Sequence, residues 1–149
     1  MGRLLVHLNA KPVMTVNRRV LKKRKVVYLL TAARPLKYKG GRSRIVYIGT
    51  TKKGVHRIAS SAAYRAVEIM STRGLKELSV FVVSCSSRPG LQTWERLEDA
   101  LIAAFRIEYE QLPKCNSQGK KKKWNDELDR MFRLKAVNKV LRQFDASNR

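Results

Sequence analysis

The sequence predicts an α+β fold: a small three-stranded, antiparallel-type sheet flanked by helices, with a basic N-terminal extension and a C-terminal helix. Short runs of β-branched and apolar residues at 26–32, 45–49 and 78–85 are typical of strands. Apolar residues recur at helical spacing in the segments between and after these runs. Strands mixed with helices in this order indicate helices packed on a single sheet.

The first two strands are expected to pair as a hairpin, each contributing one tyrosine, Tyr28 and Tyr47. Residues 34–44 between them include a proline and two adjacent glycines, which predict a basic loop. Tyr38 lies in this loop and is expected to be a nucleic-acid contact or a plain surface residue. The third strand, 78–85, is mostly apolar and is expected to be buried.

Three helices are expected, over residues 55–72, 92–111 and 124–144. Gly74 follows the first of them and is a suitable C-cap, because glycine adopts the left-handed conformation without steric cost. The short apolar segment 4–8 is a candidate for an added edge strand.

The chain divides into a basic N-terminal extension (1–25), a central domain (26–117) and a basic linker with a C-terminal helix (118–149). One hydrophobic core is expected for 149 residues. No apolar run approaches the ~18–20 residues of a membrane span, and the N-terminal apolar segment is too short for a signal peptide. We therefore expect a cytoplasmic protein with no membrane partner, whose two cysteines are reduced structural thiols.

The charge is the best guide to the partner. The formal net charge is +22, and seventeen basic residues precede the first acidic residue, Glu68. Such a surface repels itself unless it meets a polyanion, and nucleic acid is the obvious one. A basic surface that serves only solubility and a basic arm that serves only targeting are the alternatives. The candidate nucleic-acid contacts are Arg18, Arg19, Lys22, Lys23, Arg24, Lys25, Lys37, Lys39, Arg42, Arg44, Lys52 and Lys53.

Glu98 stands out on the second expected helix. Leu101, Ile102 and Phe105 follow it by three, four and seven positions, so Glu98 shares their face. A carboxylate among core positions is costly unless it is paired, hydrogen-bonded or bound to a metal. Two interpretations remain open: a structural ion pair, for instance with Arg57, or a metal ligand.

Five features in order resemble the GIY-YIG nuclease family. The first strand keeps the tyrosine of the first motif, with Val-Val in place of Gly-Ile before Tyr28, and residues 47–49 match Tyr-Ile-Gly to the letter. An arginine on the next helix, a glutamate on a later helix and a proline-asparagine segment then correspond to Arg57, Glu98 and residues 113–116.

The resemblance implies an endonuclease that hydrolyses phosphodiester bonds in DNA with Mg²⁺ or Mn²⁺. Glu98 would hold the metal, and Arg57 would hold a non-bridging phosphate oxygen with its planar fork. One of Tyr28 and Tyr47 would activate water while the other positions it. The expected supporting residues are Gly49, His56 and Asn116, with Asn116 as a structural hydrogen-bonder.

The chain departs from the family at Ser61, where many members carry His, Lys or Tyr four residues after the arginine. Tyr64 and His56 are the candidates to replace that residue.

A chain of this length leaves no room for a separate sequence-reading module, so a restriction-like or structure-specific nuclease is expected. It would be a monomer in solution or a dimer on its substrate, with RNA as the other candidate substrate. The alternative is a non-catalytic nucleic-acid-binding protein, such as a ribosome-associated RNA binder, built on the same fold.

Overall fold

The computed structural model describes residues 4–8, 11 and 22–146. Its centre is an antiparallel sheet of β1 (Val26–Tyr38), β2 (Gly41–Thr51) and β3 (Leu78–Val83), in the order β2-β1-β3. The predicted α+β fold, with a three-stranded sheet and a C-terminal helix, is confirmed.

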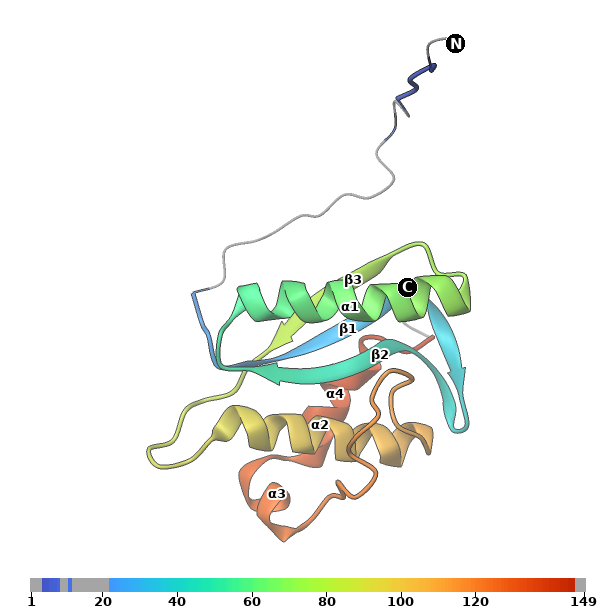
Figure 1. The fold of residues 1–149 in the computed structure, drawn as a ribbon. Helices are drawn as coiled ribbons and strands as arrows, with labels where there is room; N and C mark the ends of the chain where they lie inside the picture. The colour runs from blue at the N-terminus through green and yellow to red at the C-terminus, as the bar shows by residue number, and fades with distance from the viewer. Residues whose placement is uncertain (1–3, 9–10, 12–21, 147–149) are drawn as a thin grey trace.

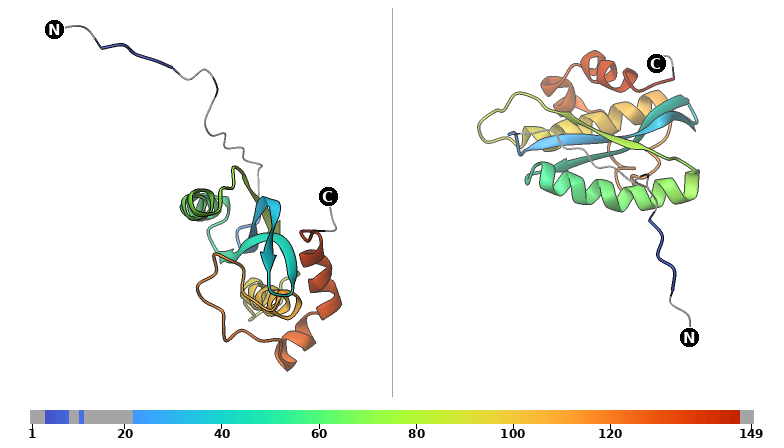
Figure 2. Two further views of the ribbon diagram at one scale, coloured as in Figure 1. Left: turned by 90° about the vertical axis from the view of Figure 1, so that its right-hand side faces the viewer. Right: turned by 90° about the horizontal axis from the view of Figure 1, so that it is seen from above.

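Helices cover both faces of this sheet (Figures 1 and 2). On one face lies α1 (Val55–Arg73), which ends at Gly74 in the predicted left-handed conformation, with φ 62°. The other face is covered by α2 (Thr93–Tyr109), which buries Leu101, Phe105 and other apolar residues against β1 and β2. No helix in residues 22–146 is long and apolar enough to cross a membrane.

The predicted loop at 34–44 is wrong, because the two strands continue through most of it and meet in a tight turn at Lys39 and Gly40. The proline that suggested a loop lies where the β1–β2 pairing shifts register, an irregularity that tolerates its missing N–H. The turn is docked on the end of α2, where the Gly40 N–H donates to the Tyr109 carbonyl at 3.0 Å.

Tyr38 is correspondingly not a surface residue. Its ring is buried in an edge-to-face contact with Phe105, with centroids 5.1 Å apart. Its hydroxyl donates to the Ile45 carbonyl at 2.7 Å and accepts from the Lys114 N–H at 3.2 Å. Strand β1 continues past Leu36 with alternating side chains, so Tyr38 points to the same buried face as Leu36.

Two other strand predictions differ from the structure. The segment 78–85 forms a strand only to Val83, and Phe81 is 46% exposed, because α2 packs against β1 and β2 rather than against β3. The apolar segment 4–8 forms no strand at all, and its four large apolar side chains are 85–94% exposed.

The helix expected at 124–144 is two helices, α3 (Asp126–Met131) and α4 (Leu134–Arg142). Phe132 between them is extended, with φ −134° and ψ 145°. Phe132 and Val137 are five residues apart in the apolar series. In a continuous helix of 3.6 residues per turn, this spacing would place the two side chains on different faces. The break lets α3 and α4 both contact α2.

Candidate active site

The pairing of β1 with β2 brings the two motif tyrosines together. Tyr28 lies opposite Gly49, and Tyr47 lies opposite Leu30, two residues beyond Tyr28. Directly opposed residues share a face of the sheet, as do residues two apart on one strand. Both phenols therefore lie on the α1 face, with ring centroids 5.9 Å apart.

Gly49 makes this arrangement possible. A Cβ at this position would lie 2.6 Å from Cε1 of Tyr47 and 2.9 Å from the Tyr28 hydroxyl oxygen. Contacts this short do not occur, so any larger residue would push at least one ring away. Gly49 is thus the residue that leaves room for both phenols.

Helix α1 supplies the polar partners of Tyr28. The Tyr28 hydroxyl donates to Oγ of Ser61 at 2.8 Å. Burial raises the pKa of Tyr28, and neighbouring Tyr47 adds to the rise, while the Ser61 hydrogen bond and the charge of Arg57 act in the opposite direction. Arg57 therefore lies within electrostatic reach of the tyrosine pair, as the sequence predicts for a residue on this helix.

Ser61 itself occupies the position at which this chain departs from the family pattern. Its two candidate replacements do not join the tyrosine pair through any described hydrogen bond. Tyr64 is 72% exposed, and His56 is exposed in the first turn of α1. The hydroxyl of Ser61 makes the contact to Tyr28 instead.

Arg65 of α1 is a further residue at the site that was not predicted. Its guanidinium lies 4.7 Å from the centre of the Tyr47 ring and forms an ion pair with Glu68 at 3.3 Å. The spacing of the sequence does indicate it, because Arg57, Ser61 and Arg65 are four residues apart and so lie on one face of the helix. Each tyrosine therefore has α1 side chains beside it.

Asn116 holds its loop against β2, as predicted. Its Oδ1 accepts from the Ile48 N–H at 3.0 Å, and its Nδ2 donates to the Ile48 carbonyl at 2.9 Å. The Cys115 N–H also donates to the Val46 carbonyl at 2.9 Å. The loop thereby satisfies the outer edge of β2 on either side of Tyr47.

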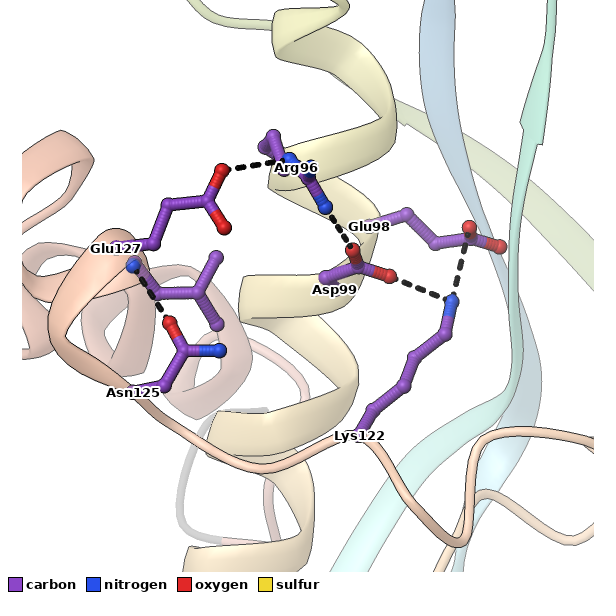
Figure 3. Close-up of polar contacts among 7 residues, drawn as sticks. Arg96, Glu98, Asp99, Lys122, Asn125 and Glu127 are labelled. Atoms are coloured by element: carbon purple, nitrogen blue, oxygen red, sulfur yellow. Dashed lines mark hydrogen bonds and ion pairs between the residues drawn. The ribbon is translucent and has the colours of Figure 1, made fainter.

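Glu98 lies on α2, the helix on the opposite face from α1 (Figures 2 and 3). The predicted neighbours Leu101, Ile102 and Phe105 are buried, and the Glu98 side chain is only 20% exposed. Burial raises the pKa of Glu98 against the opposing charge of Lys122, whose Nζ lies 3.3 Å from Oε2. The expected charged partner is therefore present, but the suggestion of Arg57 was wrong.

Lys122 binds a second carboxylate, with its Nζ 2.7 Å from Oδ1 of Asp99 (Figure 3). Burial disfavours the ammonium, but the hydrogen bond to Asp99 and the charge of Glu98 outweigh burial and raise the pKa of Lys122. A hollow of about 410 Å³ opens beside these groups, and Glu95 lines it with them.

The donors at Glu98 fit one kind of metal. No group of three or more His, Cys, Asp or Glu side chains in the described part of the chain could hold a metal ion. Mg²⁺ usually keeps several waters and needs only one or two carboxylates from the protein. Glu98 with Asp99 beside it meets that requirement, and the Lys122 ammonium between them shows that a cation is accommodated there.

The predicted catalytic residues thus fall into two groups. Tyr28 and Tyr47 lie together on the α1 side of the sheet, and exposed Arg57 of α1 is within electrostatic reach of Tyr28. Glu98 belongs to α2, and within residues 22–146 its ion pair and hydrogen bond go to Lys122 rather than to the tyrosine pair.

Most of the basic residues expected to contact nucleic acid are exposed, including Lys22 to Lys25 on the approach to β1. Arg44 differs from the rest, because it is half-buried and donates to the Gln143 carbonyl at 3.1 Å, so it also anchors the C-terminal segment. Arg18 and Arg19 lie outside the described residues.

No protein-family model matches this sequence, and neither a curated protein nor a solved structure gives a match. The interpretation of the site therefore depends on the residues and geometry described above.

Replacing Asn116 by alanine should destabilise the fold. The change strips the Ile48 N–H and carbonyl of their partners, and unsatisfied groups of this kind cost about 1–3 kcal/mol. For a chain of this size the melting temperature should fall by roughly 3–10 °C. Thermal unfolding followed by circular dichroism measures this, with exposed Ser117→Ala as the control that leaves the melting temperature unchanged. An Asn116→Ala protein as stable as the wild type would contradict the assigned role.

Proposed function

We propose that this chain is a metal-dependent DNA endonuclease of the GIY-YIG type, either restriction-like or structure-specific. One observation supports the proposal above all: Tyr28 and Tyr47 share a face of the sheet, with ring centroids 5.9 Å apart, beside Arg57 and Ser61 of α1. Two phenols and a guanidinium offer the groups that water activation and phosphate binding require.

In the proposed reaction a water molecule attacks the phosphorus in line with the leaving oxygen. The proton of that water passes to whichever phenol oxygen is ionised. The bond from phosphorus to the leaving oxygen breaks, and that oxygen keeps the electron pair and takes a proton from solvent. Arg57 holds a non-bridging oxygen and stabilises the charge that develops on it. A phenol with its usual pKa of ~10 is a weak base near neutrality. Burial raises the pKa of Tyr28 further and the charge of Arg57 only opposes that rise, so the bound metal and the arginine would have to stabilise the phenolate.

Glu98 is the proposed metal ligand, with Asp99 beside it and water completing the shell. When bound, Mg²⁺ or Mn²⁺ would supply Lewis-acid stabilisation of the phosphate oxygens. Glu98 lies on α2 and the tyrosine pair lies on the α1 face of the sheet, and no described contact joins them, so their action on one phosphate is itself part of the proposal.

The charge of the chain supports DNA as the partner, with RNA as the other candidate. The net charge is +22, and the lysines and arginines of residues 22–25, the β1–β2 turn and the end of β2 are exposed on the domain that carries the tyrosines. Contacts of this kind bind the phosphate backbone without reading sequence.

A non-catalytic nucleic-acid binder is the second candidate, and one observation favours it. Glu98 is already neutralised by Lys122, so it has a structural role that needs no metal. The two candidates share the basic surface and differ in chemistry alone.

Incubation of the protein with supercoiled plasmid separates them. The proposed function predicts nicked or linear products that require Mg²⁺ or Mn²⁺ and disappear when a chelator is added in excess. Intact plasmid at every metal concentration, with binding visible as a gel shift, would favour the non-catalytic binder.

Arg57→Ala should slow cleavage by about 10²–10³-fold, the usual cost of losing an electrostatic stabiliser of the transition state. Binding should hardly change, since Arg57 is one of thirty-three basic residues. Arg57→Lys should restore the rate only in part, because a point charge lacks the bidentate fork. Arg88→Ala removes an equal charge from an exposed turn and serves as the control with wild-type cleavage. Full activity in Arg57→Lys would contradict this role and indicate that Arg57 is only a general phosphate contact.

A further inference from the structure

Lys122 differs from the three lysines around it. Lys120, Lys121 and Lys123 are exposed, whereas the Lys122 side chain is only 32% exposed and turns back onto α2. In Figure 3 it reaches from its loop to the two carboxylates on the helix. If the four lysines were simply a solvated run, Lys122 would be as exposed as the other three.

The backbone at Lys122 is held on both sides. Its N–H donates to the Gly119 carbonyl at 3.0 Å, and its carbonyl accepts from the Arg106 guanidinium at 2.7 Å. Gly119 has φ 110°, a conformation that side chains rarely adopt, so a glycine is needed to bring the loop back. The position of the ammonium is therefore built into the loop.

The carboxylates that receive the ammonium are held as well. Asp99 Oδ2 pairs with Arg96 at 3.4 Å, and Arg96 pairs with Glu127 of α3 at 3.0 Å. Glu98 has Lys122 alone as its ion-pair partner within the described chain. Among the described residues, the charge of Glu98 is thus balanced by Lys122.

We propose that Lys122 is a positioning residue that occupies the cation position at Glu98 and competes with the divalent metal for it. The proposal rests on the proposed function only in taking Glu98 as the metal ligand. A divalent cation and an ammonium repel each other, so the two compete for the half-buried Glu98 carboxylate. Metal entry therefore requires Lys122 to swing away, and the free protein binds metal weakly.

Mn²⁺ binding without nucleic acid tests this directly, because free Mn²⁺ is counted by its electron paramagnetic resonance signal. Lys122→Met keeps a long side chain and removes the charge, so it should bind Mn²⁺ about tenfold or more tightly than the wild type. Lys121→Met makes the same charge change at an exposed neighbour and should leave the affinity within about twofold of the wild type.

Two further variants separate competition from a general structural effect. Lys122→Arg keeps the charge and should keep the weak affinity. Glu98→Gln combined with Lys122→Met should lose the tightened binding, which identifies Glu98 as the ligand. Circular dichroism establishes that each variant is folded, and if Lys122→Met is not, Lys122→Gln takes its place with the same expectation.

Unchanged or weaker Mn²⁺ binding by the folded, uncharged variant would overturn the proposal, and so would an absence of binding in both proteins. The nuclease assay is independent of this titration. A protein that cuts no DNA but binds Mn²⁺ more tightly without the Lys122 charge would refute the proposed nuclease and leave the competition at Glu98 standing.

Discussion

The register of the β1–β2 hairpin is the constraint on which the candidate site depends. It sets Gly49 opposite Tyr28, and the missing side chain leaves the space in which the rings of Tyr28 and Tyr47 lie. A slip of one residue would turn one strand's tyrosine to the other face of the sheet. Asn116 reinforces the register from outside by binding both backbone groups of Ile48, and Ser61 reinforces it from α1 by binding Tyr28. The geometry of the pair is thus over-determined by contacts from three parts of the chain.

The charged residues of the candidate site lie on two sides of the sheet. On the α1 side, Arg57 and Arg65 accompany the phenols, and this face is suited to anions. On α2, Glu98 and Asp99 both pair with the Lys122 ammonium, and this position is the proposed cation site. A phosphodiester with its metal ion carries both kinds of charge, so the proposed substrate offers a complement to each group.

Periodicity and turn chemistry were enough to predict the α+β fold, helix α1 with its Gly74 cap, and a Glu98 that needs a charged partner. They failed where an outcome depends on which segments meet in space. Tyr38 becomes a core residue because α2 covers it, and β3 stays exposed because α2 packs on β1 and β2 instead. The identity of the partner of Glu98 depends on a loop that brings Lys122 back across 24 residues of sequence, which no local pattern predicts.

Single-turnover cleavage of an end-labelled DNA duplex tests most directly whether the two groups act on one phosphate. The rates to compare are those of Glu98→Gln, of a variant with Tyr28 and Tyr47 both changed to phenylalanine, and of the two combined. Residues that act as a unit in one transition state are strongly non-additive, so the combined variant should be no slower than the worse of the other two. Losses that multiply, or a Glu98→Gln protein that cuts at the wild-type rate, would contradict a shared site.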